Sequence, residues 1–139
     1  EGLGSYKLNR IINQKISLEN IMSSAQKLPL TINKRDYTIV GSRSHMSQET
    51  EDFFQLKKKE YNSVNILSVG SSLKLCMVAE GNADVYPRYA PTMEWDTAAG
   101  HAIAKFAGCS ITQYGSYDEV LYNKKDLTNP WFLIERSHA

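Results

Sequence analysis

Short apolar runs alternate with segments of helical periodicity along most of the chain. Tyr37-Thr38-Ile39-Val40 is rich in β-branched residues and is followed by Gly41, which is typical of a buried strand that leads into a loop. Comparable runs predict further strands at Val64–Val69, Asp84–Tyr86, Ser110–Tyr114 and Phe132–Glu135. Helical spacing predicts helices between them, at residues 47–59, Leu73–Glu80 and Trp95–Ala107. Strands that alternate with helices predict an α/β fold, a layered sandwich around a central sheet.

The predicted helices have clear ends. Ser47 can cap the first helix, acidic residues fill its first turn, and Lys57–Lys59 fill its last, as the helix dipole favours. Gly81 and Gly108 are expected to stop the other two. The helix Leu73–Glu80 is apolar almost all round, which predicts burial on most sides. The last helix places a set of apolar residues at helical spacing: Trp95, Ala98, Ala99, Ala102, Ile103 and Phe106.

The first 33 residues are less regular. They contain a short strand candidate at Ser5–Leu8, apolar alternation at Ile12–Ile16 and an expected exposed loop at Ser23–Lys27. The chain lacks an initiator methionine and opens directly in strand-like sequence. We therefore expect it to be a piece of a longer protein.

Composition excludes several classes of protein. The 139 residues are 42% apolar, with 16 Lys and Arg against 15 Asp and Glu, so the net charge is only +1. That charge is too small to predict a binder of nucleic acid polymers. No apolar run approaches the roughly 20 residues of a membrane-spanning helix. Two cysteines far apart, Cys76 and Cys109, argue against a disulfide framework and favour a reducing cytoplasm.

Polar residues follow the predicted strands at two places and begin the last helix at a third, which is where open α/β sheets usually bind ligands. The first group is Gly41-Ser42-Arg43-Ser44-His45, whose side chains can bind a phosphate or a sugar. A polar turn in which the serines bond local backbone groups explains the same residues.

The second group is Gly70-Ser71-Ser72-Leu73-Lys74, at the start of a helix. Unpaired backbone N–H groups and two hydroxyls can bind an anion there. Lys74 strengthens this interpretation, because a cation in the first turn opposes the helix dipole and lies on an otherwise apolar helix. The alternative is a lysine whose ammonium reaches past the apolar surface to water.

The third group is Trp95-Asp96-Thr97-Ala98-Ala99-Gly100. Asp96 is either an acid that favours a helix N-terminus or a ligand for a divalent cation such as Mg²⁺. The small residues after it would let the helix pack closely on its neighbour. His101 follows Asp96 by five positions, so we expect it on the helix exterior or in a structural role.

Together these groups resemble a known family. Trp95-Asp96-Thr97-Ala98-Ala99-Gly100 resembles the W-D-x-A-A-G signature in the C-terminal part of the inositol monophosphatase superfamily. Other segments are similar to one branch, the 3′(2′),5′-bisphosphate nucleotidases of the bacterial sulfur-assimilation type. They are Glu1–Tyr6, Ser42–His45, Ser68–Lys74, Val78–Gly81 and Tyr86–Arg88.

The resemblance implies a Mg²⁺-dependent phosphatase that removes the 3′-phosphate of adenosine 3′,5′-bisphosphate to give AMP. Asp96 would be a metal ligand. The nucleotide would be held by a larger set, namely Ser42, His45, Ser71, Ser72, Lys74, Arg88 and Asp96. An inositol monophosphatase is the nearest alternative, and Arg88 argues against it, because a second phosphate requires a cation where inositol hydroxyls require an acid. A non-catalytic ligand-binding module is the alternative from another class.

The chain departs from the family pattern in its first half. The glutamate and the D-P-x-D-G-T loop that supply most metal ligands in the family are absent. The resemblance therefore implies the C-terminal portion of the fold, with no catalytic residue of its own and with the N-terminal half of the same enzyme as its partner. Residues 1–33 would be remnant strands from the end of the N-terminal domain, and residues 34–139 the C-terminal nucleotide-binding domain. The expected location is the cytoplasm, with peripheral attachment to the inner membrane as an alternative.

Overall fold

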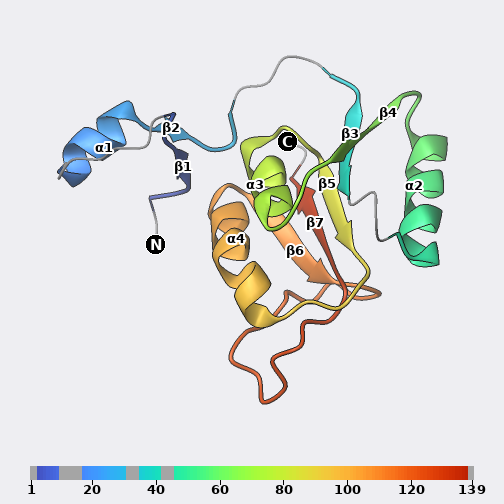
Figure 1. The fold of residues 1–139 in the computed structure, drawn as a ribbon. Helices are drawn as coiled ribbons and strands as arrows, with labels where there is room; N and C mark the ends of the chain where they lie inside the picture. The colour runs from blue at the N-terminus through green and yellow to red at the C-terminus, as the bar shows by residue number, and fades with distance from the viewer. Residues whose placement is uncertain (1–2, 10–16, 31–34, 42–45, 138–139) are drawn as a thin grey trace.

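A mixed five-stranded sheet lies at the centre of the protein (Figure 1). The computed structural model describes residues 3–9, 17–30, 35–41 and 46–137. The sheet has the order β4-β3-β5-β7-β6. Its strands are β3 (Tyr37–Gly41), β4 (Val64–Ser68), β5 (Val85–Arg88), β6 (Cys109–Gln113) and β7 (Phe132–Arg136). β3 runs parallel to both β4 and β5, whereas β7 runs antiparallel to β5 and to β6.

Helices cover both faces of this sheet. Ile39 of β3 packs in one apolar cluster with Phe54 of α2 (Gln48–Glu60). The next residue, Val40, belongs to a second cluster on the opposite face, with residues of α3 (Leu73–Glu80) and α4 (Glu94–Phe106). Because successive strand residues point to opposite faces, one strand supplies both cores. The predicted α/β sandwich is confirmed.

The helix ends follow the sequence signals. The Ser47 hydroxyl accepts a hydrogen bond from the Thr50 amide at 3.3 Å, so it caps α2 as predicted. α3 has the predicted bounds and ends at Gly81, whose φ of 88° is in the left-handed region that favours glycine. Among the described residues, no helix has both the length and the apolar character that a membrane span requires.

β5 differs from its prediction. It was expected to end before Pro87, but it continues through Pro87 to Arg88 and pairs there with Leu133 and Phe132 of β7. Proline is tolerated because β5 pairs with β3 only at Val85, so no partner strand requires the missing N–H. The extension places the Arg88 side chain at the end of a sheet strand.

The N-terminal segments lie beside the ends of α3 and α4. β1 (Tyr6–Lys7) lies within the strand predicted at residues 5–8 and pairs with β2 (Gln26–Lys27). The prediction of a loop at residues 23–27 is wrong, because this segment contains the end of α1 (Leu18–Ser24) and all of β2. Backbone hydrogen bonds of 3.2 Å and 3.0 Å join Ser5 to Phe106 and Leu30 to Glu80. The predicted alternation at residues 12–16 lies outside the described residues.

α4 presents its apolar stripe outward. Trp95, Ile103 and Phe106 are 67%, 38% and 40% exposed, and the alanines of the same stripe are exposed too. The face that packs on the sheet carries smaller or polar residues, namely Thr97, Gly100, His101 and Ala104. We call the exposed residues Trp95, Ala98, Ala99, Ala102, Ile103 and Phe106 the outer stripe of α4.

Gly100 explains the close packing of α4 on α3. A Cβ atom at Gly100 would lie 2.7 Å from Cδ2 of Leu75. The prediction that small residues after Asp96 bring this helix close to its neighbour is therefore confirmed. The prediction that α3 is buried on most sides is wrong at its first turn, where Leu73 is 59% exposed.

Candidate active site

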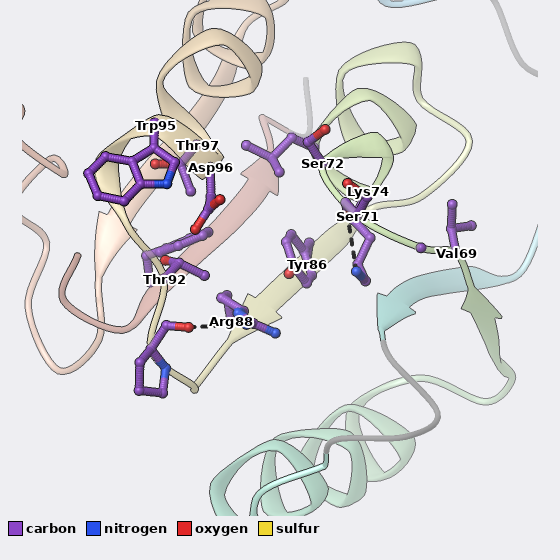
Figure 2. A pocket seen from close by; sticks show the side chains of 14 residues that line it. Val69, Ser71, Ser72, Lys74, Tyr86, Arg88, Thr92, Trp95, Asp96 and Thr97 are labelled. Atoms are coloured by element: carbon purple, nitrogen blue, oxygen red, sulfur yellow. Dashed lines mark hydrogen bonds between the residues drawn. The ribbon is translucent and has the colours of Figure 1, made fainter. Parts of the chain in front are cut away.

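A cleft of about 610 Å³ lies between the first turns of α3 and α4, with β5 between them (Figure 2). Five of the predicted site residues line it: Ser71, Ser72, Lys74, Arg88 and Asp96. They come from three elements that are well separated in sequence. Ser42 and His45 lie outside the described residues, so their predicted role in holding the nucleotide stays a prediction.

Ser71 and Ser72 form the turn from β4 into α3. Ser71 has a φ of 57°, a left-handed conformation that is uncommon for a residue with a side chain. Ser72 is the N-cap residue, yet its side chain makes no capping hydrogen bond. The first-turn amides of α3 therefore have no side-chain cap at the edge of the cleft, which is the arrangement that binds anions at helix N-termini.

Lys74 is a buried cation in this cleft. The residue is 6% exposed, and its Nζ donates a hydrogen bond to the Ser71 carbonyl at 3.2 Å. The ammonium also lies over the Tyr86 ring, 5.5 Å from its centroid. Burial, followed by the charge of Arg88, lowers the pKa of Lys74 below its usual value. Within the described part of the chain, no carboxylate forms an ion pair with Lys74.

Arg88 adds a second positive charge. Its Nη2 donates to the carbonyl of Pro91 at 3.2 Å, while its Nε is buried and has no hydrogen-bond partner among the described residues. A buried donor without a partner is destabilising unless something else accepts from it. An anion bound in the cleft would accept from this group and would offset the charges of Arg88 and Lys74.

Asp96 lies on the opposite side of the cleft, in the first turn of α4. Its Oδ2 accepts a hydrogen bond from the Met93 amide at 2.9 Å, so the carboxylate helps to cap the helix. The residue is exposed, and it is the sole carboxylate among the described residues that line the cleft. Both interpretations of Asp96 from the sequence thus remain compatible with its position.

The described residues do not form a metal site by themselves. They contain no group of three or more His, Cys, Asp or Glu side chains that could hold an ion. Mg²⁺ requires about six oxygen ligands, of which Asp96 would supply one. Further ligands would have to come from elsewhere.

His101 lies behind the cleft and not on the helix exterior. It is 4% exposed, with Nδ1 2.9 Å from the Tyr122 hydroxyl and Nε2 3.0 Å from Oε1 of Glu119. Of the two expectations for His101, the structural role is confirmed and the exterior position is wrong, because the side of α4 that packs inward carries small and polar residues. The Tyr122 hydroxyl in turn donates to Oγ1 of Thr97 at 3.2 Å. His101 therefore belongs to a hydrogen-bond network that supports the first turn of α4.

Sequence reasoning assigned no role to two residues that support the site. Tyr86 lies beneath Lys74, and Asn129 contacts the first turn of α4 from a segment 32 positions further along the chain. Tyr86 lies in the segment Tyr86–Arg88 that carries the family resemblance, but nothing local predicts its contact with Lys74, and Asn129 reads as an ordinary loop residue.

The chain resembles proteins of one family throughout. Residues 8–136 match the Inositol monophosphatase family. The chain is 41% identical over 96 residues to the 3′(2′),5′-bisphosphate nucleotidase CysQ of Salmonella typhimurium, and 38% identical over 109 residues to that of Shigella flexneri. These alignments cover 69% and 78% of the chain. The chain belongs to the inositol monophosphatase family.

A solved structure supports the same assignment. The crystal structure of CysQ from Bacteroides thetaiotaomicron, described as a bacterial member of the inositol monophosphatase family, matches 100% of the chain with a TM-score of 0.91 and 45% sequence identity. The chain spans 52% of that protein, and 37% and 43% of the Salmonella and Shigella nucleotidases. The chain therefore spans about half of the length of these relatives, or less.

Proposed function

We propose that the whole protein containing this chain is a Mg²⁺-dependent phosphatase that removes the 3′-phosphate of adenosine 3′,5′-bisphosphate to give AMP. One observation gives the strongest support. Lys74 is a buried cation beside Arg88 in a single cleft, and no carboxylate among the described residues pairs with Lys74. A substrate with two phosphates would supply the missing negative charge. The names of the relatives support the same substrate.

The residues of the cleft would bind different parts of the substrate. Lys74 and Arg88 would hold the phosphate that is not hydrolysed, through charged hydrogen bonds. The hydroxyls of Ser71 and Ser72 and the uncapped amides of α3 would bind the nucleotide beside them. In the reaction, water adds to phosphorus, the bond from phosphorus to O3′ breaks, and a proton passes to the leaving oxygen, so that AMP and inorganic phosphate result.

Asp96 would be one ligand of the metal. When bound, Mg²⁺ would supply positive charge at the attacking and leaving oxygens. Because the described residues offer one carboxylate in the cleft, the other ligands and the group that activates water would come from the remainder of the protein. We accordingly expect the 139-residue chain to have no phosphatase activity by itself.

The outer stripe of α4 would bind that remainder. Trp95, Ile103 and Phe106 form an exposed apolar surface next to Asp96, and the relatives are about twice as long as this chain or longer. Docking there would bury the stripe and bring further ligands to Asp96. The same proposal divides the chain into residues 1–33, from the end of the first domain, and residues 34–139. It places the enzyme in the cytoplasm and does not depend on peripheral attachment to the inner membrane.

An inositol phosphatase of the same family is the second candidate function. Arg88 distinguishes the two, because its buried Nε and its position beside Lys74 favour a second anionic group over inositol hydroxyls. A ligand-binding module without catalysis is the third.

Phosphate release by the whole protein tests the proposal. We expect turnover of adenosine 3′,5′-bisphosphate with a kcat/KM at least tenfold above that for inositol 1-phosphate, and no turnover by the 139-residue chain. A preference for inositol 1-phosphate would favour the second candidate. Binding of the bisphosphate by the whole protein without phosphate release would favour the third.

A further inference from the structure

Asn129 is a buried amide that ties three segments together behind the cleft. The residue is 4% exposed and lies between β6 and β7. Its Nδ2 donates to the Met93 carbonyl at 2.8 Å, to Oγ1 of Thr97 at 2.9 Å and to Oγ1 of Thr92 at 3.1 Å. Its backbone amide donates to the Thr92 carbonyl at 2.8 Å. All these acceptors lie in the loop from β5 to α4 or in the first turn of α4.

The orientation of the Asn129 amide is fixed by its partners. The Met93 carbonyl can only accept, so the Nδ2 group must face it, and a flipped amide would bring two oxygens together. Oδ1 is then left buried without a hydrogen-bond partner among the described residues. An unpaired buried acceptor is unfavourable, but the three acceptors that face Nδ2 outweigh it.

The loop that Asn129 holds is the one that orients Asp96. Met93 offers its carbonyl to Asn129 and its amide to Oδ2 of Asp96, at 2.9 Å. Thr97, the neighbour of Asp96, accepts from Asn129 on its hydroxyl and is itself 4% exposed. Asn129 therefore binds residues on both sides of Asp96 in the sequence, and the Tyr122 hydroxyl adds a second contact at Thr97. Lys74 lies on α3, away from these contacts.

We propose that Asn129 is a positioning residue that fixes the Asp96 carboxylate for the reaction. The inference rests on the proposed function, in which the cleft is the substrate site, and it adds a residue that does not touch the cleft. The Asn129 amide donates both of its hydrogens to the loop and to α4, and these hydrogen bonds set the position of Asp96. Because Lys74 is held independently, loss of Asn129 lowers turnover more than it weakens substrate binding.

Asn129→Ala in the whole protein tests this inference by two measurements. Hydrogen exchange of peptides that span residues 92–97 should accelerate at least tenfold, while exchange in α3 stays unchanged. With adenosine 3′,5′-bisphosphate as substrate, kcat should fall ten- to a hundredfold and KM should change less than threefold. Ile39→Val, on the α2 face of the sheet, is the control for a general loss of stability. Ile39→Val should leave exchange of residues 92–97, kcat and KM unchanged.

A second pair of variants keeps the test informative if Asn129→Ala does not fold. Thr97→Val removes the hydroxyl that Asn129 contacts and should lower kcat. Thr97→Ser retains the hydroxyl and should keep kcat near the wild-type value. Uniform acceleration of exchange, or equal changes in kcat and KM, would overturn the positioning role, as would an equal loss in Ile39→Val. If local exchange accelerates as expected but the wild-type protein releases no phosphate from the bisphosphate, the proposed function fails, and the inferred role of Asn129 in the reaction fails with it, while its structural contact with the Asp96 loop is upheld.

Discussion

The ammonium group of Lys74 lies 5.5 Å from the centre of the Tyr86 ring, buried at one side of the cleft. An aromatic face stabilises a cation only modestly, by about 0.5–2 kcal/mol, and does not neutralise its charge. Burial and the neighbouring Arg88 together lower the pKa of Lys74, so more of this amine is neutral at mildly alkaline pH than of an exposed lysine. We therefore expect Lys74 to bind anions and to react as an amine more readily than an exposed lysine does.

The lowered pKa of Lys74 and its position in the cleft predict selective chemical labelling. Pyridoxal 5′-phosphate is an aldehyde with a phosphate, so its phosphate should bind in the cleft while Lys74 condenses with the aldehyde and releases water. After borohydride reduction, peptide mass spectrometry should find Lys74 labelled at lower reagent concentration than the exposed Lys105, and adenosine 3′,5′-bisphosphate should protect it. Even labelling of both lysines without protection would contradict this account of the cleft.

Asp96→Asn should separate catalysis from stability. The asparagine oxygen can still accept the Met93 amide, so the cap of α4 is retained and the melting temperature should change little. The negative charge is lost, and kcat of the whole protein should fall by about two orders of magnitude or more. Near-normal turnover at saturating Mg²⁺ would show that Asp96 is only a capping residue.

Gly100→Ala should destabilise the chain although alanine favours helices. The helix preference would contribute up to about 1 kcal/mol, but the new Cβ would lie 2.7 Å from Leu75 Cδ2, and such overpacking costs about 1–3 kcal/mol. We expect a net loss in the free energy of unfolding, measured by urea denaturation. Ala102→Gly, on the outer stripe, is the matched control for helix propensity alone. A stabilised Gly100→Ala variant would show that α3 and α4 can move apart.

His101 should make stability depend on pH. Burial is the largest influence and lowers its pKa below the usual 6.5, although Glu119 partly opposes this effect and Lys105 adds to it. Between the folded-state pKa and 6.5, the unfolded chain binds more protons than the folded one. The free energy of unfolding therefore falls as the pH drops through that window.

The His101→Gln variant isolates this contribution. Its free energy of unfolding should vary less with pH than that of the wild type between the folded-state pKa and 6.5. Identical pH profiles for His101→Gln and wild type would mean that His101 titrates normally.

Local sequence signals predicted the elements that form the site. The bounds of α3 and the cap of α2 follow from a serine, a glycine and the ends of apolar runs, all of which act over a few residues. Five of the candidate side chains share one cleft because the carboxyl ends of β4 and β5 lie at the same edge of the sheet.

Other parts of the structure could not be predicted from local pattern. α4 has apolar residues on one side and small or polar residues on the other, and the stripe that usually marks the core faces outward. His101 is buried because its partners, Tyr122 and Glu119, come from a later segment. Asn129 reaches Thr97 across 32 positions of sequence, which no periodicity reveals.

The most direct test of the central claim is substrate selectivity at Lys74 and Arg88. In the whole protein, kcat/KM should be measured for adenosine 3′,5′-bisphosphate and for adenosine 3′-phosphate, with wild type, Lys74→Gln and Arg88→Gln. A charged hydrogen bond to phosphate is worth about 1.5–3 kcal/mol, so each substitution should reduce kcat/KM for the bisphosphate about ten- to a hundredfold and leave the monophosphate nearly unchanged. Equal losses on both substrates would contradict the claim that this cleft recognises a second phosphate.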